Sequence, residues 1–381
     1  MTTRTLTKRA FIRTRTFAKK NVVMLIAFAV ALATVFIVPV DKEYLDYFDY
    51  KTLSCLFCVL AVVCALKNIN FFGLVAHKIV RVFKNAKACV LALVYVTFIG
   101  SMLIANDMAL LTFLPLGYLV LTSTGKQKYM AFTFIMQNIA ANLGGMLTPF
   151  GNPQNLYLYT TFNIDNLEFM GIMAPPFALS VALITVCCLI FVKAEPLEVA
   201  DVEIKLPVFK TIAYFVLFAL SIVIVFRVIP FWIGLIAVPL VLLVLDRKAL
   251  LSVDYPLLLT FVFFFIFAGN VSRIGVVNEF LSGLLNKNVL LVSTASCQII
   301  SNVPSSILLS RFTTDYRSLL VGVNIGGVGT LIASLASLIT FREYVGHNPD
   351  KTGRYIALFS AFNFGFLIIL AAFEYLLLYV I

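Results

Sequence analysis

Charged residues are scarce in this chain: Asp, Glu, Lys and Arg make up 12% of its 381 residues, whereas 61% are hydrophobic. A soluble globular protein is about a quarter charged, so this composition cannot cover a water-facing surface. Histidine is also scarce, with two residues, and neither H-E-x-x-H nor G-x-S-x-G occurs. The sequence therefore gives no sign of a metalloprotease or a serine hydrolase, and we do not expect an enzyme.

Long apolar runs recur along almost the whole chain instead. Each is close to the roughly 20 residues that a helix needs to cross a bilayer, and the short alternating strands of outer-membrane barrels are missing. The pattern predicts an all-α polytopic membrane protein with about nine spans and two further hairpins. The net charge of +11 lies mainly in short flanks of the apolar segments, as expected for topology signals. A nucleic-acid partner is therefore not expected, and membrane lipid is.

Basic flanks and polar linkers divide the chain into parts. Residues 1–20 are rich in Lys and Arg and contain no acid, which predicts a cytoplasmic tail of a multi-pass protein in the cell membrane. A polar stretch with mixed charge follows the middle of the chain, and one apolar segment comes after it. The predicted organisation is a basic tail, a first repeat over 21–192, a linker with one crossing helix over 193–229, and a second repeat over 230–381.

Two segments of the first half are too long for single spans. One helix over 88–122 would be roughly 50 Å long, against a hydrocarbon core of about 30 Å. This segment contains Asn106 and Asp107 near its middle and has basic flanks on both sides. It predicts a re-entrant hairpin with these residues at the tip; an ordinary pair of spans is the alternative. The second segment, 129–160, contains N-L-G-G-M-L-T-P-F-G-N-P-Q-N, whose prolines and glycines predict a broken helix.

The second half repeats these polar interruptions in the same order. I-A-N-D-M-A-L-L corresponds to I-S-N-V-P-S-S-I-L-L, which pairs Asn106 with Asn302. N-L-G-G-M-L-T corresponds to N-I-G-G-V-G-T, which pairs Asn142 with Asn324. The single crossing helix between the halves would invert the second copy, an arrangement typical of secondary transporters.

The second copy is accordingly predicted to hold a hairpin over 288–312 and a broken helix over 317–341. The hairpin is short enough to be a plain span, so its assignment depends on the repeat alone.

Hairpin tips and broken helices carry free backbone groups that can bind ions. Helix N-termini suit an anion, and unwound carbonyls with Asn and Thr oxygens suit sodium. The glycine pairs could bring the backbone close to a ligand or could pack helices tightly. Asp107 is the only acid in the expected core, where a carboxylate is costly and usually functional; a hairpin-tip hydrogen bond is the alternative. The predicted binding residues are Asn106, Asp107, Asn142, Gly144, Gly145, Thr148, Gly151, Asn152, Asn155, Ser301, Asn302, Asn324, Gly326, Gly327 and Thr330.

These motifs resemble the ion-transporter superfamily, which includes citrate transporters, arsenite permeases, sodium/proton antiporters of the same fold and divalent anion–sodium symporters. The resemblance implies a scaffold with a mobile transport domain, elevator-type alternating access and commonly a homodimer. It also implies a small anionic substrate, such as citrate, a dicarboxylate or an oxyanion. The family pattern would place sodium or substrate contacts on Asn106, Asn142, Thr148, Asn152, Asn302, Asn324 and Thr330.

The resemblance leaves the coupling ion open between sodium and the proton. Sodium would bind at Asn106, Asn142, Asn302 and Asn324, and no other cofactor is expected. The tips read Ala-Asn-Asp and Ser-Asn-Val, not the Ser-Asn-Thr of the sodium–dicarboxylate branch. An arsenite-type efflux permease, a sodium/proton antiporter of the same fold and a channel are the alternatives.

Overall fold

The computed structural model describes residues 21–197 and 205–380, and almost all of them are helical or lie in short connections. The predicted basic tail over 1–20 lies outside the described residues. Within the described part, six helices are long and apolar enough to cross a membrane. The predicted polytopic all-α class is therefore confirmed, whereas the count of about nine spans and two hairpins stays a prediction. The six helices are Tyr50–Asn68, Ala86–Ile104, Asn166–Phe191, Val208–Val225, Tyr255–Ser272 and Pro349–Tyr379.

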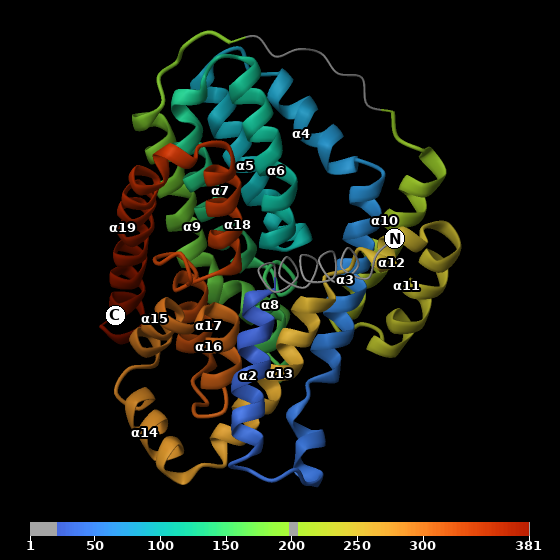
Figure 1. The fold of residues 1–381 in the computed structure, drawn as a ribbon, viewed down its shortest axis with the longest axis vertical. Coiled ribbons are helices and arrows are strands. Elements are labelled where there is room, and N and C mark those ends of the chain that lie inside the picture. The colour runs from blue at the N-terminus through green and yellow to red at the C-terminus, as the bar shows by residue number, and fades with distance from the viewer. Residues whose placement is uncertain (1–20, 198–204, 381) are drawn as a thin grey trace, which may run out of the picture.

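One group of helices comes from the start and the middle of the chain. In it α13 packs along α2, and α3 packs along α10 and α11 (Figure 1). The predicted first span over 21–40 is helical only to Val35, because the chain turns before Pro39. The group consists of α2 (Val22–Val35), η1 (Lys42–Tyr47), α3 (Tyr50–Asn68), α10 (Val208–Val225), α11 (Phe231–Leu245), α12 (Arg247–Leu251) and α13 (Tyr255–Ser272).

A second group contains all the interrupted segments. Helices α5, α6 and α7 pack together in the upper part of Figure 1, and α15, α16 and α17 pack together in the lower part. Long helices α9 and α19 run beside both sets. The group consists of α5 (Ala86–Ile104), α6 (Asn106–Ser123), η2 (Gln127–Tyr129), α7 (Met130–Gly144), η3 (Gly145–Leu147), α8 (Pro153–Thr161), α9 (Asn166–Phe191), α15 (Val289–Ile300), α16 (Asn302–Leu309), α17 (Tyr316–Ile325), α18 (Leu335–His347), η4 (Pro349–Lys351) and α19 (Thr352–Tyr379).

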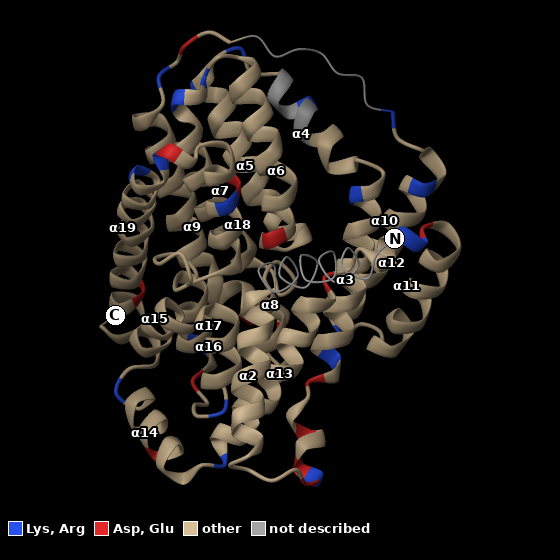
Figure 2. Ribbon diagram, in the orientation of Figure 1, with Lys and Arg blue, Asp and Glu red and all other residues tan. Residues whose placement is uncertain are grey.

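Two short helices connect the groups at opposite ends of the molecule. Helix α4 (Phe71–Arg81) leads from α3 to α5 at the top of Figure 1, and α14 (Gly275–Leu285) leads from α13 to α15 at the bottom. Charged residues gather mainly in the end regions and connections, whereas the helical middle is almost uncharged (Figure 2). This distribution is that of a protein whose middle lies in a bilayer.

The two groups contact each other mainly through α8 and α16. Helix α16 packs against α13, and α8 packs against both α3 and α16. Arg311, after α16, donates a hydrogen bond to the carbonyl of Tyr47 at 2.9 Å. Arg227, in the turn between α10 and α11, donates to the Asn163 side chain at 2.7 Å and lies 3.9 Å from the Tyr159 ring centroid.

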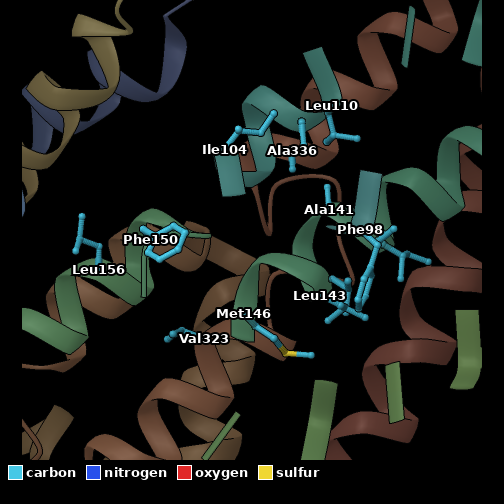
Figure 3. Packing of buried hydrophobic residues seen from close by; sticks show 14 of the residues in the cluster. Phe98, Ile104, Leu110, Ala141, Leu143, Met146, Phe150, Leu156, Val323 and Ala336 are labelled. Carbon is cyan, nitrogen blue, oxygen red and sulfur yellow. The ribbon is translucent and has the colours of Figure 1, made fainter. Parts of the chain in front are cut away.

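Apolar side chains surround the interruptions of both halves. Leu143 and Met146 flank the break between α7 and α8, and Val323 and Ala336 flank the break between α17 and α18 (Figure 3). All four belong to one buried apolar cluster. The polar backbone of the breaks is therefore enclosed by protein and not by lipid, which is the condition for irregular structure at membrane depth.

Candidate functional site

The two helical hairpins turn at equivalent residues. Ala105 separates α5 from α6 with φ 66°, and Ser301 separates α15 from α16 with φ 74°. Both are non-glycine residues in the left-handed region, which costs energy and is concentrated at functional sites. The next residue is asparagine in both turns. The side-chain oxygen of Asn106 accepts from the following backbone N–H at 2.9 Å, and that of Asn302 does the same at 2.9 Å.

Each broken helix is joined to its hairpin by a threonine. The Thr148 hydroxyl donates to the carbonyl of Met102 in α5 at 2.8 Å. The Thr330 hydroxyl donates to the carbonyl of Gln298 in α15 at 3.0 Å. Met102 and Gln298 each lie four residues before the hairpin asparagine, so positions paired in the sequence make the same contact in both halves.

The paired asparagines of the breaks lie within hydrogen-bonding distance of different partners. Asn142 lies in the last turn of α7, and its side-chain oxygen accepts from Asn106 at 3.3 Å. Asn324 lies in the last turn of α17, and its side-chain nitrogen donates to Asn155 at 2.6 Å. Its oxygen accepts from Asn152 at 3.2 Å. Asn142 thus connects a hairpin tip to its own broken helix, whereas Asn324 connects the second half to the first.

In each glycine pair, the first glycine packs against a hairpin helix and the second lies next to a site asparagine. A Cβ at Gly144 would lie 2.3 Å from the Phe98 carbonyl, and a Cβ at Gly326 would lie 2.9 Å from Cys297. These first glycines therefore allow tight packing on the hairpin helices. A Cβ at Gly145 would lie 2.3 Å from the Asn152 oxygen, and one at Gly327 would lie 3.0 Å from the Asn302 nitrogen. The second glycines therefore leave space for site asparagines.

The remaining predicted residues complete this arrangement. The Asn155 side chain donates to the carbonyls of Gly145, Met146 and Thr148, each at 3.2 Å, and so stabilises the unwound turn. Gly151 lies so close that a Cβ there would be 2.3 Å from the Gly145 carbonyl. The Ser301 hydroxyl donates to the carbonyl of Ala333 at 3.2 Å.

Several buried polar atoms in this region have no hydrogen-bond partner in the described part of the chain. They include one carboxylate oxygen of Asp107, the side-chain oxygens of Asn152 and Gln154, and the side-chain nitrogen of Asn302. Buried polar groups are normally paired, so each unpaired atom needs an explanation such as a ligand, an ion or water. The arrangement therefore offers one acceptor at the first tip, two acceptors at the first break and the start of α8, and one donor at the second tip.

Sequence reasoning missed the amides that support the site. Gln298 donates to the carbonyls of Gly326 at 2.9 Å and Val328 at 3.2 Å, which holds the second break against α15. Asn138 donates to Asn363 in α19 at 3.3 Å, one turn before Asn142. A signal was present, because Gln298 and Asn138 each lie four residues before a predicted asparagine. Nothing in the sequence connected Asn363 to either half.

The expectation that Asp107 is the only acid in the core is wrong. Glu374, near the end of α19, is 1% exposed. Its Oε1 atom has no hydrogen-bond partner among residues 21–197 and 205–380. Periodicity alone could not separate its helix face from the lipid-facing one, because α19 is apolar on all sides.

The start of the predicted linker is bound to the end of the first hairpin. Glu195 accepts from Lys126 at 3.0 Å and from the Tyr129 hydroxyl at 2.9 Å, and it also pairs with Lys128. The hydrogen bonds from Lys128, Lys126 and Tyr129 lower the pKa of Glu195 to about 2. A backbone bridge between Asn85 and Pro196 lies beside this cluster. The linker is therefore attached to the α5–α7 end before it passes into residues 198–204, which the structure does not describe.

The seven cysteines are free thiols. Among the described residues, no group of three or more His, Cys, Asp or Glu side chains could hold a metal ion. The polar groups that converge are instead amides, hydroxyls and backbone carbonyls, which suit an alkali cation or a small anion better than a transition metal.

Comparison with known proteins assigns the chain to a family. The model of the citrate transporter family matches residues 10–315. An uncharacterized transporter of Methanocaldococcus jannaschii is 33% identical over 332 residues, which cover 87% of this chain and 91% of the relative. Inner membrane protein YbiR of Escherichia coli is 29% identical over 82% of this chain and 85% of its own length. The putative transporter arsB of Dictyostelium discoideum is 22% identical over 40% of this chain and 27% of its own. The chain therefore belongs to the citrate transporter family and is a multi-pass membrane transporter, not an enzyme.

Proposed function

We propose that this transporter is a secondary active carrier that moves a small anion by elevator-type alternating access, driven by a sodium or proton gradient. The observation that carries the proposal is the convergence of two hairpin tips and two helix breaks around buried amides. In this cluster Asn152, Asn155 and Asn324 connect the two halves. Citrate, a dicarboxylate or an oxyanion is the substrate class, in agreement with the family.

The internal symmetry of the contacts supports an inverted repeat. Thr148 and Thr330 donate to equivalent hairpin carbonyls. At the two hairpin tips, the side-chain oxygens of Asn106 and Asn302 accept from the next backbone N–H, and both tips have positive φ. Random similarity between apolar segments would not reproduce such contacts. We therefore propose that 21–192 and 230–381 are two copies of one unit, with hairpins that enter the membrane from opposite faces and an N-terminus in the cytoplasm.

The unpaired atoms suggest where each ion binds. The free Asn302 nitrogen is a donor at the N-terminus of α16, where an anion is favoured. The free oxygens of Asp107 and Asn152 are acceptors, which suits a sodium ion beside the carbonyls of the first break. Both amide orientations are determined by the bonds of the other side-chain atom, since Asn302 accepts through oxygen and Asn152 donates through nitrogen.

The arrangement of the two helix groups supports an elevator movement. Helices α2, α3 and α10–α13 would form the scaffold, and the hairpins and broken helices would form the moving domain. The groups contact through α8 and α16, which carry the site residues that would travel. A homodimer through the scaffold, surrounded by membrane lipid, is part of this proposal.

Uptake by purified protein in proteoliposomes tests the proposal. Thermal-shift screening against citrate, dicarboxylates, oxyanions and sodium selects the substrate. The variant N302A should then bind this anion about tenfold or more weakly, because a hydrogen bond to a charged partner is worth about 1.5–3 kcal/mol. The surface variant N286A is the matched control. Equal flux in both directions without accumulation under either ion gradient would indicate a channel and reject the carrier.

An efflux permease of the arsenite type is the second candidate. It is favoured by the similarity to the putative transporter arsB of Dictyostelium discoideum. Neutral arsenous acid would not need a coupled cation at the unpaired oxygens of Asp107 and Asn152. Stabilisation by arsenite together with indifference to citrate and sodium would select this candidate.

A further inference from the structure

Glu374 occupies the buried face of the last helix. The residues of α19 that are turned toward the protein include Asn363, Leu367, Leu370 and Glu374, at helical spacings of four, three and four. Helix α19 packs against α7, α9, α15 and α17. A carboxyl group on this face is therefore enclosed by helices that the proposed function assigns to the moving domain.

No cation in the described part of the chain neutralises Glu374. Helix α7 carries no titratable side chain, and α15 carries Cys297 alone. The one basic residue on these four helices is Arg317 at the start of α17, which is largely exposed and pairs with Glu168 of α9 at 2.9 Å. The other titratable groups on these helices are Cys187 and Cys188 of α9 and Tyr316 of α17.

An ionised carboxylate without a partner is strongly unfavourable at such a position. The neutral acid is the form that this environment accommodates at lower cost, because only the charged form loses its full hydration. A leucine would fill the same buried position without this cost, but it could not bind a proton. A buried carboxyl group without a cation partner can do so, because its neutral and charged forms differ by one proton.

Helix α19 also connects Glu374 to the binding region. Asn363, on the same face, accepts from Asn138, whose carbonyl accepts from Asn142 at 3.1 Å. A change of charge at Glu374 therefore acts on a helix that contacts α7 one turn before Asn142.

We propose that Glu374 is a proton-binding site and that its proton moves with the transported anion. The carboxylate accepts a proton from hydronium and becomes a neutral acid, and it returns the proton to water on release. The coupling to the anion rests on the proposed transport function, whereas the protonation itself does not.

Infrared spectroscopy tests the protonation without any substrate. The C=O band of a protonated carboxylic acid should be present in the wild-type protein at neutral pH, shift in heavy water, and be reduced in E374Q. The variant E279Q changes an exposed glutamate of α14 and should keep the full band. An unchanged band in E374Q would overturn the proposal, and this result is independent of what the protein transports.

Transport in proteoliposomes tests the coupling. A gradient of one pH unit can concentrate a solute that moves with one proton up to about tenfold. This accumulation should be lost in E374Q, while exchange of labelled for unlabelled anion without a gradient should persist. E374L serves where E374Q gives low yield, because it fills the same buried position. Accumulation equal to that of the wild type in either variant would refute the coupling, and a failure of all variants and the wild type to transport any anion would instead reject the proposed function.

Discussion

Replacing Asn324 by alanine should destabilise the protein more than the same change at its repeat partner Asn142. Within the part of the chain that the structure describes, Asn324 is the only hydrogen-bond partner of two buried atoms, the Asn155 side-chain oxygen at 2.6 Å and the Gln154 side-chain nitrogen at 3.5 Å. In the same residues, Asn142 is the only partner of one buried atom, the Asn106 side-chain nitrogen at 3.3 Å. Asn152 loses one bond in N324A but keeps its bond to the Asn142 carbonyl.

The magnitude follows from the atoms that are left unpaired. A buried donor or acceptor without a partner costs about 1–3 kcal/mol, so N324A should cost about 2–6 kcal/mol and N142A about 1–3 kcal/mol. The longer Gln154 contact places the N324A value toward the lower half of its range, because hydrogen bonds weaken with distance.

Thermal unfolding of the detergent-solubilised protein measures the difference. N324A should have the lowest melting temperature, N142A an intermediate one, and the surface variant N286A that of the wild type. N324D is informative as well, because it keeps the oxygen that accepts from Asn152 but loses the donor to Asn155. If N142A melts at or below the temperature of N324A, the bonds between the two halves do not stabilise the protein more than the bond between Asn142 and its own hairpin.

Four further predictions concern the breaks, the linker, the first tip and the topology. G145A should lower both stability and substrate affinity, because its Cβ would lie 2.3 Å from the Asn152 oxygen, and melting curves with and without substrate measure both. The pKa of Glu195 is lowered to about 2, so its contribution to stability is present above the ordinary value of 4.5 and is lost as the pH falls toward 2; E195Q should show a shallower acid decline in melting temperature. D107N should lose sodium-driven uptake if the carboxylate binds sodium, and should respond to sodium and pH gradients as the wild type does if it only caps the hairpin. K128C should react with a membrane-impermeant maleimide from the cytoplasmic side, and reaction from the opposite side would make the first hairpin a full span.

The interruptions could be located from the sequence because each one is a polar exception in an apolar chain. Asn106 and Asn302 were placed at hairpin turns by the length of the segments and by the repeat, and helices end next to both in the structure. Pro153 begins α8 directly after the predicted break, since proline is tolerated in the first turn of a helix.

The hydrogen-bond and packing partners of the residues at these interruptions could not be predicted from the sequence. The two halves have matching asparagines, yet Asn324 bonds to the other half and Asn142 to its own hairpin. The glycine pairs look equivalent in sequence, but the first member packs against a hairpin helix and the second faces an asparagine. These differences depend on side-chain positions across the interface, on which local periodicity contains no information.

The sequence by itself determined the membrane class, the family resemblance and the positions of the four polar interruptions. These properties follow from composition and from local backbone chemistry, because a lipid environment requires long apolar helices and tolerates Asn, Gly and Pro breaks only where protein encloses them. Only the tertiary structure decided which amides meet across the halves, which polar atoms stay unpaired, and that Glu374 is buried. Contacts between residues as distant as Asn155 and Asn324 arise from packing of whole helices, so no local pattern can encode them.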